Sequence, residues 1–193
     1  MFTGIIENLG KFEENKDSNF VFSSNLKFCK KLKKGTSVSV NGVCLTVIKK
    51  PTNNKFSVEI MPETQSKTML GKLKNKTIVN LELPATLNTF LSGHIVQGHI
   101  DGIGQVDSII PDGNSKILTI KTDKNILDYI VKKGSVAING ISFTVVEADK
   151  NIFKVGVIPF TWKNTTLYGV VVGDFINIET DVLGKYLKNY INK

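Results

Sequence analysis

The sequence predicts a mainly β protein built from two tandem copies of one small barrel or sandwich, followed by a short helix. Three observations carry this prediction. The chain of 193 residues repeats itself with a period of about 95 residues, which is too long for a solenoid and fits a duplicated domain. Both copies consist of short polar–apolar alternations separated by turn residues, which is typical of half-buried strands. The last residues belong to neither copy and have helical spacing.

The internal repeat is visible in four pairs of segments. Residues 33–48 return as 132–146, 56–70 as 153–167, 78–82 as 176–179, and 2–11 as 96–105. The break between the copies falls near residues 91–94. We therefore predict an N-terminal barrel over residues 1–93, a C-terminal barrel over 94–181 and a helix over 182–193.

Strands and tight turns follow each other within each copy. Residues 37–40 (SVSV) and 56–60 (FSVEI) alternate polar and apolar side chains, as strands with one buried face do. Asn41-Gly42 and Asn139-Gly140 lie between β-branched runs, and Asn-Gly is a preferred sequence for a two-residue hairpin turn. Short strands with closely spaced turns favour a small barrel or a sandwich.

One helix is expected in each copy, before its Lys-Gly dipeptide. In the second copy we expect Asp123 as N-cap and Gly134 as the end, with a buried face of Ile126, Leu127, Ile130 and Val131. In the first copy we expect a cap at Ser23 or Ser24 and a buried face of Leu26, Cys29 and Leu32. Cys29 is therefore interpreted as a small buried hydrophobe.

The tail is predicted to form an amphipathic helix after Asp181. Its apolar residues recur at helical spacing with lysines between them: Leu183, Tyr186, Leu187, Tyr190 and Ile191. An isolated helix of about 12 residues is marginal in water, so this apolar stripe must pack on something. Its own barrel and a subunit interface are both open.

Composition excludes several classes of protein. No apolar run reaches the length of about 20 residues that a bilayer span needs, and the N-terminus lacks the pattern of a secretory signal. The two cysteines do not form a disulfide framework, so we expect a cytoplasmic protein. The net charge of +8 comes from lysine without any arginine, which disfavours nucleic-acid recognition. His94 and His99 lack nearby cysteines, so no metal site is predicted.

Differences between the two copies mark candidate functional positions. Cys44 corresponds to Ser142, Ile5 to His99, Glu63 to Phe160 and Pro84 to Asp181, whereas Thr46 matches Thr144 and Thr64 matches Thr161. These positions lie beside glycines and turns at strand ends, where small barrels often bind ligands. Neutral drift in surface loops, an inert core position for Cys44, and core or turn positions for the histidines are the alternatives.

Several motifs resemble one known family along essentially the whole chain. MFTGII at the N-terminus, NGVCLTV (41–47), MPET (61–64), GHIVQGHIDG (93–102), NGISFTV (139–145) and then IPFT look like riboflavin synthase of the α-chain type. The resemblance implies two six-stranded Greek-key barrels plus a C-terminal helix, assembled as a homotrimer without cofactor or metal. It implies conversion of two 6,7-dimethyl-8-ribityllumazine molecules into riboflavin and 5-amino-6-ribitylamino-pyrimidinedione by four-carbon transfer. Lumazine synthase is a further candidate partner.

The resemblance also implies two lumazine sites, formed where the N-terminal barrel of one chain faces the C-terminal barrel of its neighbour. The first is expected at Gly4, Ile5, Ile6, Cys44, Leu45, Thr46, Glu59, Ile60, Met61, Pro62, Glu63 and Thr64. The second is expected at Gly98, His99, Ile100, Lys133, Ser142, Phe143, Thr144, Gly156, Val157, Ile158, Pro159, Phe160 and Thr161.

Chemistry suggests roles for some of these residues. The lumazine 7-methyl group is acidic, so a modest base suffices, either His99 or a water held by Ser142 and Thr144. The nucleophile that adds at C7 of the other molecule would be Ser37, Cys44 or a bound water. Asp181 would orient groups or accept protons. Some family members have Asp where this chain has Asn139, so Asn139 is given only a positioning role.

Two rival functions remain. The first is a non-catalytic antenna protein that binds lumazine or flavin in the same two barrels; such relatives lose polar groups in one pocket, whereas this chain has polar candidates in both copies. The second is a basic barrel that binds single-stranded nucleic acid, which needs aromatic residues interleaved with lysines on a strand face. Trp162 and Phe160 lie close together in a turn-like segment, which gives this function poor support.

Overall fold

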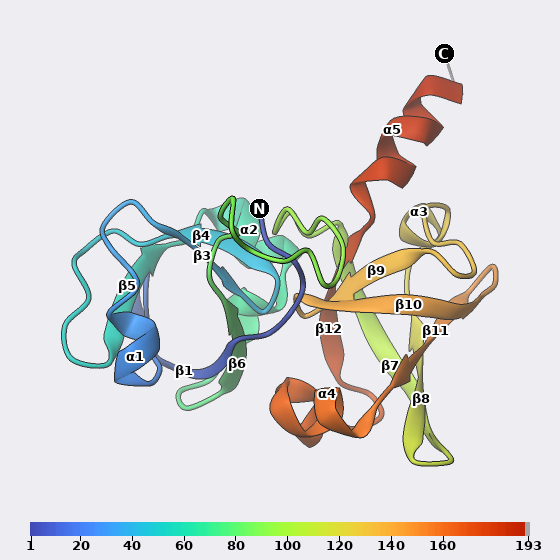
Figure 1. The fold of residues 1–193 in the computed structure, drawn as a ribbon, viewed down its shortest axis with the longest axis horizontal. Coiled ribbons are helices and arrows are strands. Elements are labelled where there is room, and N and C mark those ends of the chain that lie inside the picture. The colour runs from blue at the N-terminus through green and yellow to red at the C-terminus, as the bar shows by residue number, and fades with distance from the viewer. Residues whose placement is uncertain (192–193) are drawn as a thin grey trace.

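The computed structural model describes residues 1–191 and contains two six-stranded β-barrels that lie side by side (Figure 1). The predicted fold class is confirmed. The first barrel contains β1 (Asn8–Lys16), β2 (Asn19–Ser23), α1 (Leu26–Cys29), β3 (Ser37–Val40), β4 (Val43–Thr46), β5 (Lys55–Glu59), α2 (Pro62–Lys67), η1 (Met69–Lys72) and β6 (Ile78–Glu82). The second contains β7 (Gly102–Asp112), β8 (Ser115–Lys121), α3 (Lys124–Leu127), β9 (Ser135–Ile138), β10 (Ile141–Ala148), β11 (Ile152–Val157), α4 (Pro159–Asn164), η2 (Thr166–Gly169) and β12 (Phe175–Thr180), and α5 (Val182–Ile191) follows it.

The strands of the two barrels have the same spatial order. In the first barrel this order is β4-β3-β6-β1-β2-β5, and the equivalent strands of the second barrel follow one another in the same way. Both first strands even carry an irregularity in register at the same place, between Phe12 and Glu14 and between Val106 and Ser108. A bulge is a specific local feature, so its recurrence supports duplication of one domain.

The barrels differ in closure. The second is closed because the long strand β10 pairs with both β9 and β11. In the first barrel β4 ends at Thr46, and the isolated bridge between Val47 and Val58 joins its end to β5. Pro51 follows in this segment and has no N–H to donate to a ladder, which fits the shorter strand.

Each barrel has its own apolar core. The first is rich in aromatic residues, with Phe22 stacked on Phe56 and tilted against Phe12. The second is built largely from aliphatic residues such as Leu118, Ile120 and Ile138. Inward side chains alternate along the strands with outward ones, as the period of two requires. The outward faces of β3, β4, β9 and β10 therefore take no part in the two cores, and other segments of the chain can pack on them.

The two predicted Asn-Gly turns are confirmed and meet each other between the barrels. Asn41 and Gly42 have φ of 46° and 81°, and Asn139 and Gly140 have φ of 46° and 78°, as the hairpin turn requires. A Cβ atom on Gly42 would lie 2.6 Å from the amide nitrogen of Gly140. Only glycine therefore allows the two hairpin tips to touch.

Four asparagines connect the barrels in a nearly symmetric network. The Asn80 side-chain amide donates to the carbonyl oxygen of Asn139 at 2.9 Å, and that of Asn177 donates to the carbonyl oxygen of Asn41 at 2.9 Å. The side-chain oxygens of Asn41 and Asn139 accept from the backbone amides of Asn80 and Asn177 at 2.7 and 2.8 Å. Buried amides that satisfy one another in this way hold two surfaces in a single register.

The first-copy helix differs from the prediction at its start. The N-cap of α1 is Asn25, whose side chain accepts from the Phe28 amide at 2.8 Å, and not Ser23 or Ser24. Ser23 instead ends β2 and donates its hydroxyl to Glu13. Leu26 is 49% exposed, whereas Cys29 and Leu32 are buried as predicted.

The second-copy helix is shorter than predicted. Asp123 occupies the N-cap position of α3 without a side-chain capping bond, and the helix ends at Leu127, well before Gly134. After it the Ile130 amide donates to the carbonyl of Leu127, a tighter i→i+3 turn that breaks the helical period. Ile130 therefore stays buried while Val131 is 62% exposed, contrary to the prediction.

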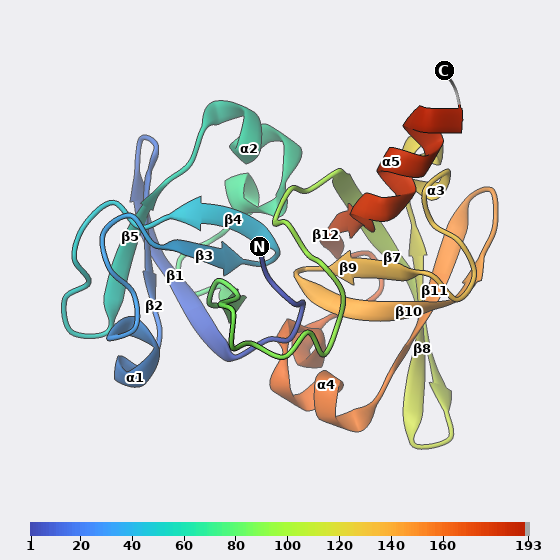
Figure 2. The same cartoon turned by 45° about the horizontal axis from the view of Figure 1, so that its top comes forward.

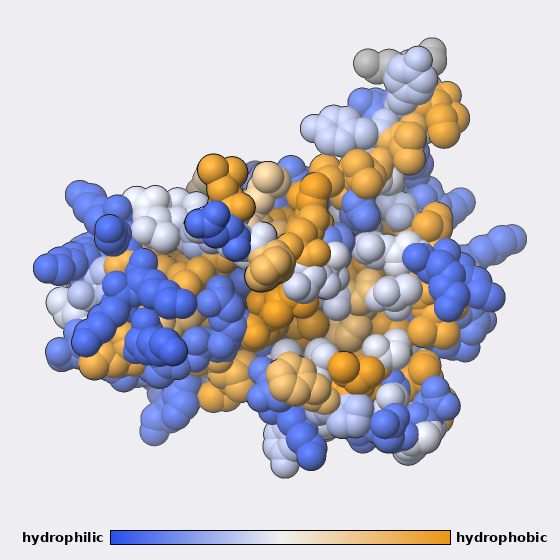
Figure 3. All heavy atoms as spheres, in the orientation of Figure 1, coloured by the Kyte–Doolittle hydropathy of each residue, from blue (hydrophilic) through white to orange (hydrophobic). Residues whose placement is uncertain are grey.

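The helix α5 extends away from both barrels (Figures 1 and 2). The predicted amphipathic helix is present over 182–191; residues 192 and 193 lie outside the described part of the chain. None of its residues is buried, and hydrophobic side chains are exposed along it (Figure 3). Its lysines anchor its base, because Lys185 Nζ lies 2.7 Å from Asp101 and Lys188 Nζ lies 2.9 Å from Asp128. Its apolar stripe is thus not packed along its own barrel.

Among residues 1–191 no helix combines the length and the apolar character that crossing a bilayer demands.

Candidate functional site

Two extended segments lie between the barrels and are paired with each other. These are the N-terminal arm, residues 1–6, and the connecting arm, residues 95–100. Phe2 and Val96 form an antiparallel bridge, in which each amide donates to the carbonyl of the other at 2.7 and 3.1 Å. Figure 2 shows both segments passing between the two barrels. Each arm can therefore reach residues of either barrel.

Each arm completes the surface of the barrel from the other repeat. The carbonyl of Gly98 accepts from the Cys44 amide at 2.9 Å, and the carbonyl of Gly4 accepts from the Ser142 amide at 2.8 Å. A Cβ atom on Gly98 would lie 2.5 Å from Cys44 Cβ, and one on Gly4 would lie 2.6 Å from Ser142 Cβ, so only glycine fits. Ile100 packs on the first core and Ile6 on the second.

This crossing corrects the predicted grouping of residues. The expectation taken from the family resemblance groups residues 4–6 with Cys44 and residues 98–100 with Ser142, so that each arm belongs to the barrel of its own repeat. In the structure the N-terminal arm lies on β10 and the connecting arm lies on β4. Sequence similarity between the copies identifies equivalent positions and cannot reveal an exchange of this kind.

The first-barrel pocket is a cavity of about 210 Å³ at the contact between β4, α2 and the connecting arm. The thiol-bearing Cys44 is half-buried, and His99 and Glu63 are exposed. The predicted candidates from opposite repeats thus line one cavity, whose residues are Val43, Cys44, Glu63, Thr64, Lys67, Thr68, Gly98, His99 and Ile100. A thiol, an imidazole, a carboxylate and an ammonium group together provide the components for nucleophilic and acid–base chemistry.

The second-barrel cluster combines a hydroxyl, an imidazole and a carboxylate. His94 Nδ1 lies 2.7 Å from Ser142 Oγ, while His94 Nε2 is buried without a hydrogen-bond partner among the residues that the structure describes. Burial lowers the pKa of His94, and the nearby negative charge of Asp181 opposes this by raising it. Asp181 also accepts from the Leu183 amide at 3.0 Å at the start of α5. In this cluster burial thus favours the uncharged form of the imidazole that lies beside the Ser142 hydroxyl.

Comparison of the two copies does not select His94. The repeats are offset by 94 residues in this region, since Val96 corresponds to Phe2, so the position equivalent to His94 falls before Met1 of the printed sequence. The comparison of copies therefore offers no residue with which His94 could be compared. The signal that the sequence does contain is its place in GHIVQGHIDG, five residues before His99.

A buried glutamate at the end of each barrel's last strand holds an arm in place. Glu82 of β6 accepts from the Thr3 amide at 2.6 Å, the Thr3 hydroxyl at 2.7 Å and the Gly4 amide at 3.1 Å. Glu179 of β12 accepts from the amides of Gln97, Gly98 and His99 at 2.6, 2.9 and 3.1 Å. These glutamates occupy equivalent positions in the repeats, and each anchors the arm that precedes its own barrel.

Burial changes the titration of both carboxyl groups. It raises the pKa of Glu82, with the bonds from Thr3 and Gly4 acting in the opposite direction. Burial raises the pKa of Glu179 to about 7, against the lowering effects of its backbone donors and of Lys185, while Asp101 raises it further. In both groups the loss of hydration destabilises the carboxylate form more than the hydrogen bonds stabilise it.

We expect the raised pKa of Glu179 to make a larger contribution to the free energy of unfolding at acidic pH than at alkaline pH. A folded-state pKa of about 7 against the ordinary value of 4.5 means that the folded protein retains a proton over this range. The stabilising contribution is present below about pH 4.5 and is lost as the pH rises through about 7, a change of about 3 kcal/mol.

Urea unfolding of the parent and of Glu179→Gln at about pH 5 and about pH 8 measures this contribution. The stability advantage of the parent over the variant should be larger at the acidic pH. The comparison of the two proteins cancels His94, whose lowered pKa acts in the opposite direction. An advantage that grows with pH instead would contradict the expected sign.

The other predicted site residues fall into two groups. The side chains of Leu45, Ile60, Phe143 and Val157 lie in the barrel cores, so only their backbone can face a ligand. Around these lie exposed or half-buried positions at the strand ends and at the starts of α2 and α4: Ile5, Thr46, Glu59, Met61, Pro62, Thr64, Lys133, Thr144, Gly156, Ile158, Pro159, Phe160 and Thr161. Met61, Ile158 and Phe160 are more than half exposed although apolar.

The candidate nucleophile Ser37 and the core residue Cys29 are both separated from the first-barrel pocket. Ser37 pairs with Thr46, whereas Ser39 is the residue opposite Cys44. Ser37 therefore lies on the same face of β3 as Ser39, two residues further from Cys44 along the strand. Cys29 is buried in the first core, and burial raises the pKa of its thiol. Within residues 1–191 no group of three or more His, Cys, Asp or Glu side chains is arranged to hold a metal ion.

Comparison with known proteins identifies the family. The family model described as a lumazine binding domain matches residues 3–84 and again residues 97–181. Riboflavin synthase of Actinobacillus pleuropneumoniae is 42% identical over 196 aligned residues, covering 100% of this chain and 91% of that protein. The chain belongs to the riboflavin synthase family. Riboflavin synthase of Bacillus subtilis is a further member, 35% identical with the same coverage.

Solved structures show the same two-barrel fold. A crystal structure of LumP complexed with 6,7-dimethyl-8-(1'-D-ribityl) lumazine has a TM-score of 0.81 at 23% identity, covering 93% of this chain and 99% of that one. LumP complexed with riboflavin gives a TM-score of 0.83 at 24% identity with the same coverage. The two LumP structures therefore share the fold of this chain at low sequence identity.

Proposed function

We propose that this protein is a riboflavin synthase that converts two 6,7-dimethyl-8-ribityllumazine molecules into riboflavin and 5-amino-6-ribitylamino-pyrimidinedione. One molecule donates a four-carbon unit and the other accepts it, so the products together contain all atoms of the substrates. The reaction needs two bound copies of one ligand in different chemical surroundings. The barrels of residues 1–93 and 94–181 would each bind one lumazine, with the arm of the other repeat completing each site, and residues 182–193 would serve oligomerisation.

One observation carries this proposal: two lumazine-binding domains in one chain present different reactive groups. The first-barrel pocket combines Cys44 with His99, and the second-barrel cluster combines Ser142 with His94 and Asp181. A protein that only binds its ligand has no need for such groups in both sites. Full-length identity of 42% to a riboflavin synthase supports the same conclusion.

The geometry suggests how the two sites share the chemistry. In the first pocket, the Cys44 thiol would add at C7 of one lumazine while His99 accepts its proton. In the second site, the pair of Ser142 and His94 would take a proton from the 7-methyl group of the other lumazine, directly or through a water that Thr144 also holds. Asp181 would stabilise the resulting imidazolium. Ser37 is the weaker candidate for the nucleophile, because it does not line the first pocket.

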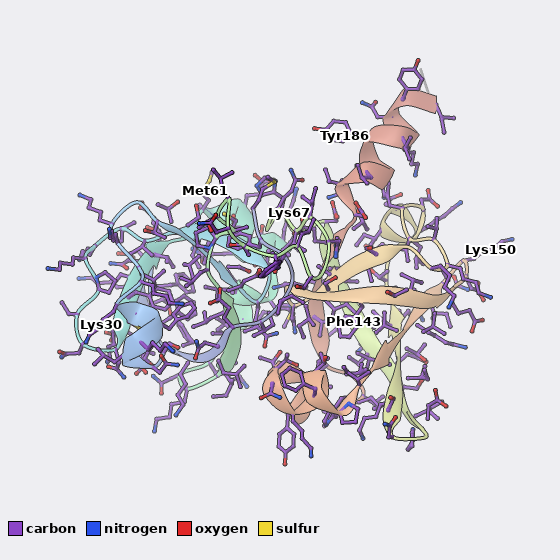
Figure 4. All side chains as sticks on the ribbon, viewed as in Figure 1. Lys30, Met61, Lys67, Phe143, Lys150 and Tyr186 are labelled. Carbon is purple, nitrogen blue, oxygen red and sulfur yellow. The ribbon has the colours of Figure 1, made fainter. Side chains whose placement is uncertain are left out.

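Assembly would bring the two sites together. The apolar residues of α5 are between 62% and 82% exposed, namely Leu183, Tyr186, Leu187, Tyr190 and Ile191. Figure 4 shows Tyr186 on the part of α5 that extends away from the barrels. We propose that three such helices pack together in a homotrimer, so that the first barrel of one protomer faces the second barrel of its neighbour. Holding two rings in reacting register can supply effective molarities of about 10⁵ M or more.

A non-catalytic lumazine- or flavin-binding antenna protein is the second candidate function. The fold similarity to LumP with bound lumazine and riboflavin favours it, because these complexes have the same architecture. The polar groups in both sites favour the enzyme instead.

Incubation with 6,7-dimethyl-8-ribityllumazine alone distinguishes the candidates. We expect riboflavin absorbance to appear with one riboflavin formed for every two lumazines consumed. Bound lumazine without new riboflavin would support the antenna protein, and absence of binding would reject both functions.

A cytoplasmic location and an association with lumazine synthase stay predictions of the sequence. The two cysteines are free, which fits a reducing compartment.

A further inference from the structure

Each of the two arms is held by a glutamate of one barrel while it completes the site of the other barrel. Glu179 belongs to β12 of the second barrel, and its carboxylate accepts from three successive amides of residues 97–99. The next contact of this arm is with the first barrel, where the Gly98 carbonyl accepts from the Cys44 amide at 2.9 Å. The same arm carries His99 into the first-barrel pocket.

The mirror arrangement exists at the other arm. Glu82 belongs to β6 of the first barrel and accepts from the amides of Thr3 and Gly4. The Gly4 carbonyl then accepts from the Ser142 amide of the second barrel at 2.8 Å. Each glutamate thus lies in one barrel, and the arm it anchors ends at a site residue of the other.

We propose that Glu179 and Glu82 are crossed positioning residues: Glu179 sets the place of His99 beside Cys44, and Glu82 sets the place of the N-terminal arm beside Ser142. Neither carboxylate lines the pocket of Cys44. Each acts through backbone amides, and charge-assisted bonds to several successive amides hold a segment more firmly than neutral bonds. The inference rests on the proposed function only in treating His99, Cys44 and Ser142 as site residues.

The chemistry of the carboxylate explains why glutamine is a sharp test. All partners of Glu179 are N–H donors, so both of its oxygens must accept. A carboxamide offers one oxygen and one NH₂ group, and the NH₂ group cannot accept from an amide. Glu179→Gln therefore loses at least one of the three bonds with little change of volume. The matched variant Glu82→Gln makes the same change at the other arm.

Amide hydrogen exchange of the ligand-free protein at about pH 8, where Glu179 with its pKa of about 7 is mostly ionised, distinguishes the two arms. The amides of Cys44 and Ser142 are equivalent reporters, since each donates to a glycine carbonyl of an arm. We expect Glu179→Gln to speed exchange at Cys44 by about tenfold and leave Ser142 unchanged, because one lost charged bond corresponds to roughly this factor. Glu82→Gln should speed exchange at Ser142 and leave Cys44 unchanged.

Thiol alkylation and kinetics give two further readouts. Cys44 should be alkylated faster in Glu179→Gln than in the parent, while the buried Cys29 stays protected. In Glu179→Gln the loss of turnover should fall on kcat more than on KM, because His99 is misplaced while most ligand contacts remain. Should this variant fail to fold, Glu179→Asp keeps the charge but is too short to reach all three amides, and the same shift at Cys44 is expected, only smaller.

A general loosening of the fold would accelerate both reporter amides in both variants, and that outcome would overturn the proposal. Unchanged exchange at Cys44 in Glu179→Gln would overturn it as well. The exchange experiment needs neither ligand nor turnover, so a failure to form riboflavin would reject the proposed function and leave this test valid.

Discussion

Truncation after Leu183 is expected to abolish assembly of the proposed trimer and to slow riboflavin formation strongly. The deletion removes the apolar residues of α5 that no part of their own barrel buries, including Tyr186, Leu187 and Tyr190. Without the proposed interface, the two lumazine sites of neighbouring protomers would no longer face each other. The activity that depends on holding two rings together should then fall by a factor of about 100 or more, given the size of proximity effects.

Sedimentation velocity and initial rates at one protomer concentration check this expectation. A milder variant separates the interface from the anchoring of the helix, because truncation also removes the ion pairs of Lys185 with Asp101 and Lys188 with Asp128. Leu187→Lys places a charge on the apolar stripe and keeps both ion pairs, while Asn189→Lys makes a similar change outside that stripe. We expect only Leu187→Lys to reduce assembly. A truncated chain that sediments like the parent would refute the role of α5.

Replacement of His99 by alanine is expected to slow turnover by about 100-fold, the usual scale for loss of an acid–base group. His99 lines the first-barrel pocket together with Cys44 and Glu63, so its imidazole is placed to accept a proton in the pocket of the proposed nucleophile. Because alanine leaves most ligand contacts in place, the loss should appear in kcat rather than in KM.

Two control variants accompany His99→Ala. Ile5→Ala changes the equivalent position of the other arm, where an apolar side chain offers only contact, so a rise in KM with a smaller loss of kcat is expected. Cys29→Ala changes a buried core residue and should lower stability with little effect on kcat. Rates and urea unfolding midpoints are measured on all three variants. Equal losses of kcat in the three would show that comparing the two copies selects functional residues poorly.

Local elements could be predicted from the sequence wherever one short-range cause dominated. The Asn-Gly turns appear at the predicted dipeptides because a positive φ at both residues is a local demand. Strands β3 and β5 follow the alternation of residues 37–40 and 56–60 because one face must be buried. Duplication was equally visible, since each copy repeats the same pattern.

The helices were predicted less well because caps compete over short distances. Ser23, Ser24 and Asn25 are all capable N-caps, and the pairing of β2 through Ser23 left Asn25 in the capping position. Val131 would share a buried helical face with Leu127 only if the helix continued, and the tight turn after Leu127 prevents this. The order of residue types in the sequence cannot distinguish between candidate N-cap residues that are neighbours in the chain.

The sequence by itself thus determines the duplication of the barrel, the positions of the Asn-Gly hairpins and the alternation of core-facing side chains along the strands. Each of these features depends on residues that are close together in the sequence. Contacts between distant segments decide which groups act together. Cys44 meets His99, and Ser142 meets His94, because the two arms pair at Phe2 and Val96 and then continue to opposite barrels. No periodicity records that exchange, since it depends on the packing of whole barrels against each other.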